Sequence, residues 1–216
     1  MSNYIISYFI LLLIVSVIGV VRYKKLTTPF KILSVLIILT LLLEITSEIC
    51  AKKYKNNLPV SHFTVLSEYI FLSLTYYFIF KNKAIRTSIK IIMLIFIILF
   101  FVNAIFIQPY HSAFPSNMYT LEEIIYAIFS LMLFKQMLLY PLPVNIIKQS
   151  VFWFNTSILF YSTTMFFNFG LINYYIKHHL NDQVIFDFIA GINMIFYLLI
   201  GISIFIDNKQ TSTNNG

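Results

Sequence analysis

Five glutamates lie inside the long hydrophobic segments of this 216-residue chain, and their type and spacing could do chemistry. They are Glu44, Glu48, Glu68, Glu122 and Glu123. A carboxylate within an apolar segment of membrane length is costly, so it usually faces a bundle interior or a water-filled cavity, where it serves function. When the segments are threaded in order through a bilayer, none of the five falls in the cytoplasmic half. This predicts a site in the outer half of the membrane.

The spacing of these glutamates predicts which of them meet. Glu44 and Glu48 are four residues apart, so they share one helix face. Glu68, in the next segment, is expected at about the depth of Glu44, so that the two could meet across a pair of helices. Of the adjacent residues Glu122 and Glu123, at most one is expected to face the bundle. The sequence does not say which, and Glu123 is taken as the candidate.

Seven polar residues on the outer side form the candidate ligand-binding site. They are Glu68, Glu44, Glu48, Glu123, Asp187, His62 and Asn103. Glu68 is the strongest candidate because its depth leaves no water within reach of the side chain. Structural explanations stay open for the others. Glu44 and Glu48 could be protonated and bonded to neighbouring helices, and the acidic residues at the starts of later segments could favour positive helix ends.

No motif of known catalytic or metal chemistry accompanies these residues. The four histidines show no His-x-x-x-His or His-Glu-x-x-His spacing, and no glycine-rich phosphate loop or nucleophile elbow occurs. The Glu122-Glu123 pair is similar to that of membrane CAAX-type proteases, but Ala127 stands where that motif needs arginine. No catalytic residue, metal site or cofactor is therefore predicted, and a non-enzymatic role is favoured.

Composition indicates the elements that must position the site. Hydrophobic residues make up 59% of the chain, charged residues 11%, and the mean hydropathy is +0.84. These values are typical of a polytopic membrane protein. We predict an all-α bundle of seven transmembrane helices in one domain, residues 1–206, followed by a short polar cytoplasmic tail, residues 207–216. The expected spans are 4–21, 30–49, 59–80, 89–107, 118–140, 151–172 and 184–206.

The distribution of basic residues predicts the orientation of the bundle. Eleven lysines and arginines fall in one set of connections and four in the other, and short cytoplasmic loops retain the basic residues. The amino terminus is therefore expected outside and the carboxyl terminus in the cytoplasm. The net charge of +7 is thus largely a topology signal, and nucleic-acid binding is not expected because the chain lacks a soluble basic face.

Three short motifs carry a resemblance to known proteins. They are residues 56–68 (NNLPVSHFTVLSE), 103–109 (NAIFIQP) and 152–159 (FWFNTSIL). Together they resemble a large group of uncharacterised seven-helix bacterial membrane proteins, loosely similar to the membrane sensory modules of histidine kinases. In that group, acidic residues in the third helix and at the start of the fifth match Glu68 and one of Glu122 or Glu123. The resemblance implies a multi-pass protein of the bacterial cytoplasmic membrane, but no activity.

An outward polar pocket without a catalytic constellation predicts a receptor-like or signalling membrane module. It would bind a small ligand, such as a small cation, from the outer side. It would pass a helix rearrangement to a cytosolic or membrane partner chain, since the chain has no room for a cytosolic output domain. Two alternatives stay open: a membrane-embedded enzyme on a lipid or prenyl substrate, with Glu68 and Glu44 as acid and base, and an ion or proton pathway.

Overall fold

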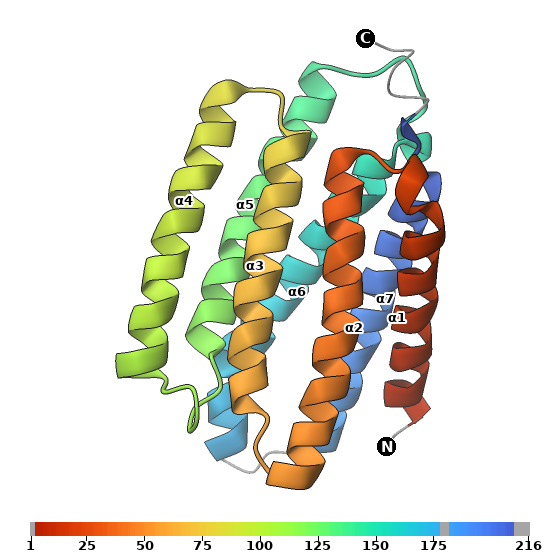
Figure 1. Ribbon diagram of the computed structural model, residues 1–216. Coiled ribbons are helices and arrows are strands. Elements are labelled where there is room, and N and C mark those ends of the chain that lie inside the picture. The colour runs from red at the N-terminus through yellow and green to blue at the C-terminus, as the bar shows by residue number, and fades with distance from the viewer. Residues whose placement is uncertain (1–2, 178–181, 210–216) are drawn as a thin grey trace.

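The computed structural model describes residues 3–177 and 182–209, and this part of the chain is helical, with no β-strand. Seven long helices alternate in direction (Figure 1). They are α1 (Asn3–Arg22), α2 (Thr28–Tyr54), α3 (Leu58–Ile79), α4 (Lys83–Val102), α5 (Ser116–Leu139), α6 (Ser150–Lys177) and α7 (Asp182–Ile206). The predicted all-α class is confirmed. Residues 210–216 of the predicted tail lie outside the described part.

Four of the described helical segments are long and apolar enough to cross a membrane. They are Ile6–Lys25, Thr28–Tyr54, Lys83–Ile107 and Asp187–Ile206. Large apolar side chains also remain exposed on the outer surface, such as Phe106 at 77%. An exposed apolar surface of this extent indicates a membrane protein. The other three helices, α3, α5 and α6, carry more polar and charged residues, many of them buried inside the bundle.

The helices form a ring with one helix outside it. In the ring, α1 packs on α2 and α7, α2 on α3, and α6 on both α5 and α7. Helix α4 packs mainly on α3 and lies at the edge of the bundle (Figure 1). Helices α3 and α5 pack less extensively on each other than on α2 and α6 respectively. Their junction is therefore where polar bridges contribute most to the packing.

Local sequence explains most helix ends. Pro29 and Pro59 occupy the first turns of α2 and α3, where the missing N–H costs nothing. Asn82 caps α4, because its side chain accepts hydrogen bonds from the backbone N–H groups of Ala84 and Ile85 at 2.8 and 3.4 Å. The prolines thus lie outside the helix interiors, as the sequence indicated. A π-helical turn, Asn103–Ile107, extends α4, and no sequence pattern predicted it.

A buried carboxylate fastens the end of α7 to the neighbouring connections. Asp207, 5% exposed, accepts hydrogen bonds from the Thr27 backbone N–H at 2.7 Å and from the Ser150 hydroxyl at 3.0 Å. Its carbonyl oxygen accepts from Arg22 at 2.9 Å, and the Arg22 guanidinium lies 5.2 Å from the centroid of the Phe205 ring. Burial raises the pKa of the Asp207 carboxyl, while these donors and Arg22 oppose the shift. We call these contacts the Asp207 clasp.

Candidate acidic site within the bundle

Three of the five glutamates line one small cavity inside the ring of helices. The cavity has a volume of about 30 Å³, and Glu68, Glu122 and Glu123 contribute its carboxylates. The other lining residues come from α2, α3, α5, α6 and α7: Leu33, Leu36, Ile37, Thr40, Leu72, Tyr126, Ile158, Tyr161, Phe196 and Tyr197. No basic side chain is among them. A volume of this size holds about two water molecules.

Both members of the adjacent pair face the cavity. Glu122 and Glu123 are 2% and 3% exposed, and one carboxylate oxygen of each, Oε2, is buried without a hydrogen-bond partner in the described part of the chain. The expectation that only one of them faces the bundle is therefore wrong. Adjacent helical side chains diverge by about 100°. Because α5 packs between α3 and α6, its inward surface is wide enough to take both.

The position of Glu68 is fixed through its backbone. The Tyr126 hydroxyl on α5 donates to the backbone carbonyls of Tyr69 at 3.1 Å and Glu68 at 3.3 Å. Two more tyrosines join the same helices, since Tyr119 donates to the Ser61 carbonyl at 3.3 Å and Tyr76 lies 2.6 Å from the Ser130 hydroxyl. These tyrosine bridges span the loose junction of α3 and α5, directly beside the acidic cavity.

Glu44 lies next to the cavity without lining it. Its carboxylate accepts a hydrogen bond of 3.1 Å from the Tyr8 hydroxyl, which ties α2 to α1. It is close enough to Glu68 for two ionised carboxylates to repel each other. Glu44 thus lies near Glu68, as its spacing predicted, and it also bonds α1, a helix that the predicted site did not include.

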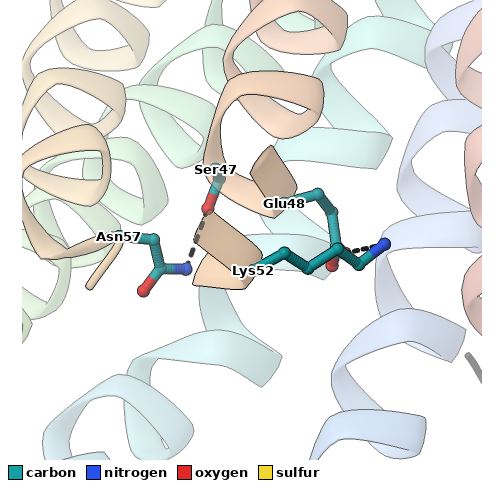
Figure 2. Close-up of polar contacts among 4 residues, drawn as sticks. All are labelled: Ser47, Glu48, Lys52 and Asn57. Atoms are coloured by element: carbon teal, nitrogen blue, oxygen red, sulfur yellow. Dashed lines mark hydrogen bonds and ion pairs between the residues drawn. The ribbon is translucent and has the colours of Figure 1, made fainter. Parts of the chain in front are cut away.

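Glu48 lies on the surface of α2, away from the cavity. Figure 2 shows its side chain paired with Lys52, at 3.4 Å, while Ser47 turns to the other side and accepts a hydrogen bond of 2.9 Å from Asn57. Its side chain is 38% exposed. Glu48 lies on the same helix as Glu44 but outside the acidic site. Glu48→Gln is therefore a suitable control for variants that remove a carboxylate from the cavity.

The remaining candidates lie apart from the cavity. His62 is buried, and its Nε2 lies 3.0 Å from the carbonyl of Ala113, to which it donates. Asn103 is buried in an amide network, donating to Gln108 at 3.1 Å and accepting from Asn117 at 3.2 Å. Both residues hold the α4–α5 connection in place. Asp187 lies half-buried near the start of α7 and does not line the cavity.

A wider cavity of about 500 Å³ lies at the α4–α5 connection. It is lined by Leu58, Ile107, Gln108, Ser112, Ala113, Phe114 and Asn117. None of these side chains carries a charge, and the amides of Gln108 and Asn117 are already engaged in the network with Asn103. The charged chemistry of the molecule is therefore concentrated in the smaller cavity.

Four polar residues that line the acidic cavity were not predicted from the sequence. They are Thr40, Tyr126, Tyr161 and Tyr197. Tyr126 follows Glu122 by four residues, and Tyr161 and Tyr197 lie deep within α6 and α7. A tyrosine far from a span end cannot belong to an interfacial belt, and this was the available signal. Tyr76, near the end of α3, is also fully buried and donates to Asn155 at 3.1 Å.

The arrangement suits hydrogen-bonded or protonic chemistry better than metal chelation. No group of three or more histidine, cysteine, aspartate or glutamate side chains in the described residues is close enough to hold a metal ion. The carboxylates surround the cavity instead of converging on one point, and no cation offsets them there. A buried carboxyl without a counter-cation favours its neutral, protonated form. The site is therefore a small acidic cavity without a basic side chain in its lining.

Comparison with known proteins adds no relative, because no protein-family model, curated protein or solved structure matches this chain.

Proposed function

We propose that this protein is a receptor-like membrane module that binds a small monovalent cation at Glu68, Glu122 and Glu123 in exchange for protons. In this proposal all seven helices cross a bacterial cytoplasmic membrane, with the amino terminus outside. The observation that carries it is that three carboxylates line one cavity. Two of them have a buried oxygen without a hydrogen-bond partner in the described residues, and no basic side chain is in the lining.

The placement of basic residues supports the orientation. The connections α1–α2, α3–α4 and α5–α6 and the end of α7 all lie at one end of the bundle (Figure 1). These connections and the helix turns next to them hold eleven of the fifteen lysines and arginines. Basic residues in short loops are retained in the cytoplasm, so this end is the cytoplasmic one. In this proposal the ligand reaches the site from the outer side.

The size and charge of the cavity define the ligand class. An occupant in about 30 Å³ is no larger than about two water molecules, which admits ammonium or an alkali cation and excludes choline-sized amines. A cation bound there replaces one or more carboxyl protons, so the net charge of the interior stays near zero. The same site makes the protein responsive to external pH, because alkaline conditions remove the protons and strengthen cation binding.

Occupancy has a structural route to the cytoplasmic end. A cation draws carboxylates on α3 and α5 together, and these helices are joined by tyrosine bridges. Farther along the same helices, Tyr76 contacts Ser130 and Asn155, and Asn155 donates to the Ser130 carbonyl at 2.9 Å. This second polar cluster links α3, α5 and α6. A shift at the cavity would thus reach the cytoplasmic ends of three helices, where a partner chain would read it.

The single tryptophan provides a test. Trp153 lies at the cytoplasmic end of α6 and donates to the Ile147 carbonyl at 2.8 Å, so its fluorescence reports on that end of the helix. In purified protein, ammonium, sodium and potassium chlorides are titrated at two pH values, with choline chloride as the oversized cation. The wild type and Glu48→Gln should respond to the same small cation, whereas Glu68→Gln and Glu123→Gln should not. A wild-type response in both cavity variants would overturn the proposal.

A proton pathway is the second candidate, and one observation favours it. Hydroxyl and amide groups continue past the carboxylates: Ser130 follows Glu123 by seven residues, or about 10 Å along α5, and lies beside Tyr76 and Asn155. Proton flux into proteoliposomes that Glu123→Gln abolishes would establish a pathway. The enzyme alternative has less support, since a cavity of about 30 Å³ has no room for a lipid chain.

A further inference from the structure

Two cations on α4 converge on one aromatic ring of α3. The Arg86 guanidinium lies 4.3 Å from the centroid of the Tyr77 ring, and the Lys90 ammonium lies 4.9 Å from it. The two basic residues are four apart, so they share one face of α4. Like charges at this spacing repel each other, and an aromatic face offsets only part of that repulsion.

The surroundings of these cations contain no counter-charge. The first turn of α4 has no acidic residue, although the amino end of a helix favours anions and disfavours cations. The ion pair found among the described residues, Glu48 with Lys52, belongs to the opposite end of the bundle, so Arg86 and Lys90 have no acidic partner there. The Arg86 Nε is buried, again with no hydrogen-bond partner in the described ranges.

From Ile91 onward, the exposed side of α4 is apolar. Exposed side chains on it include Ile91, Leu94, Ile95 and Ile98. These follow directly after Lys90, so an apolar surface of membrane length begins where the pair of cations ends. This is the pattern of a phospholipid, whose charged headgroup lies above two hydrocarbon chains.

We propose that Arg86, Lys90 and Tyr77 bind the phosphate of an anionic phospholipid whose acyl chains lie along the exposed apolar side of α4. A guanidinium can hold two phosphate oxygens at once, and the ammonium adds a second charge. Basic clusters at the membrane surface attract anionic lipids in this way. The site is independent of the acidic cavity and does not rest on the receptor proposal.

Lipid binding to the purified full chain in an uncharged detergent tests the proposal. Native mass spectrometry compares phosphatidylglycerol with phosphatidylcholine of the same acyl chains. The wild type should retain phosphatidylglycerol preferentially, and each charge removed should weaken that binding about fivefold. The variant R86Q/K90Q should therefore lose more than about tenfold. The matched control K24Q/K25Q removes two exposed charges from the same end of the bundle and should bind as the wild type does.

Three results would overturn the lipid site. They are wild-type binding by R86Q/K90Q, an equal loss in K24Q/K25Q, which would show diffuse attraction only, and displacement of the lipid by inorganic phosphate at equal concentration. If R86Q/K90Q does not fold, the charge-preserving variant R86K/K90R decides: binding within about threefold of the wild type supports the site, and loss of binding contradicts it.

Discussion

The acidic cavity and the Asp207 clasp bury carboxylates of similar exposure, yet they differ in the hydrogen-bond donors that they offer to these carboxylates. Asp207 accepts hydrogen bonds from Thr27 and Ser150, just before α2 and at the start of α6, and Arg22 is bonded to its carbonyl oxygen. Glu122 and Glu123 each keep an unpartnered oxygen in the described part of the chain, and no cation lines their cavity. A satisfied carboxylate stabilises the fold, whereas an unsatisfied one costs stability and is retained for what it binds. The difference separates a structural acid from a functional one.

Removal of the Asp207 side chain should give the largest loss of stability. Asp207→Ala leaves the Thr27 N–H and the Ser150 hydroxyl without their acceptor, which costs about 1–3 kcal/mol in the free energy of unfolding. Thermal unfolding of the purified protein in detergent measures it. An unchanged midpoint would show that the clasp does not hold the end of α7.

Replacement of the cavity glutamates, in contrast, should not lower the stability of the protein. Glu122→Gln and Glu123→Gln replace an unpartnered carboxyl by a neutral amide, so we expect stability to stay within about 0.5 kcal/mol of the wild type or to rise. The same unfolding assay applies. A loss as large as that of Asp207→Ala would mean that these carboxylates have partners that stabilise the fold, and the contrast between the two regions would fail.

Loss of a tyrosine bridge should lower the free energy of unfolding by less than Asp207→Ala does, but by more than the cavity variants do. Tyr126→Phe removes a hydroxyl that donates to the carbonyls of Glu68 and Tyr69, at a cost of about 0.5–1.5 kcal/mol. If the bridge also transmits occupancy, the amplitude of the Trp153 response should fall while the cation concentration at half response stays constant. A change in that concentration alone would place Tyr126 in ligand binding instead.

The contribution of Asp207 to the stability of the protein should fall as pH rises. The pKa of Asp207 is raised by burial, so its contribution to stability is fully present below about pH 4, the ordinary range for aspartate, and is lost as pH rises through the raised value. The stability difference between the wild type and Asp207→Asn should therefore decrease from about pH 4 to pH 7. Because the clasp and the cavity share no contacts, the cavity carboxyls should cancel in this difference. A difference that grows with pH would contradict the assignment.

The surface ion pair should give the smallest effect. Glu48→Gln breaks a pair whose side chains are 38% and 71% exposed, and such pairs contribute about 0–1 kcal/mol. Its midpoint of unfolding and its cation response should both match the wild type. A clear loss of the cation response would return Glu48 to the site.

The sequence predicted the helices more reliably than the site. Long apolar segments and proline positions located α1 to α7, because length and hydropathy act locally. The inward position of Glu68 followed from depth. That Glu122 and Glu123 both face inward, and that Glu44 bonds Tyr8, depend on how helices rotate and pack, and no local pattern specifies this. Asp207, assigned to a polar tail from composition, is buried because two distant connections, α1–α2 and α5–α6, meet it.

Proton release on cation addition tests the central claim most directly. Ammonium, sodium or potassium chloride is added to unbuffered purified protein at constant ionic strength, with choline chloride as the reference. We predict that at least one small cation releases protons from the wild type and from Glu48→Gln, and that the double variant E122Q/E123Q releases none. Equal release from the double variant, or no release from the wild type with any small cation, would contradict cation binding at these carboxyls.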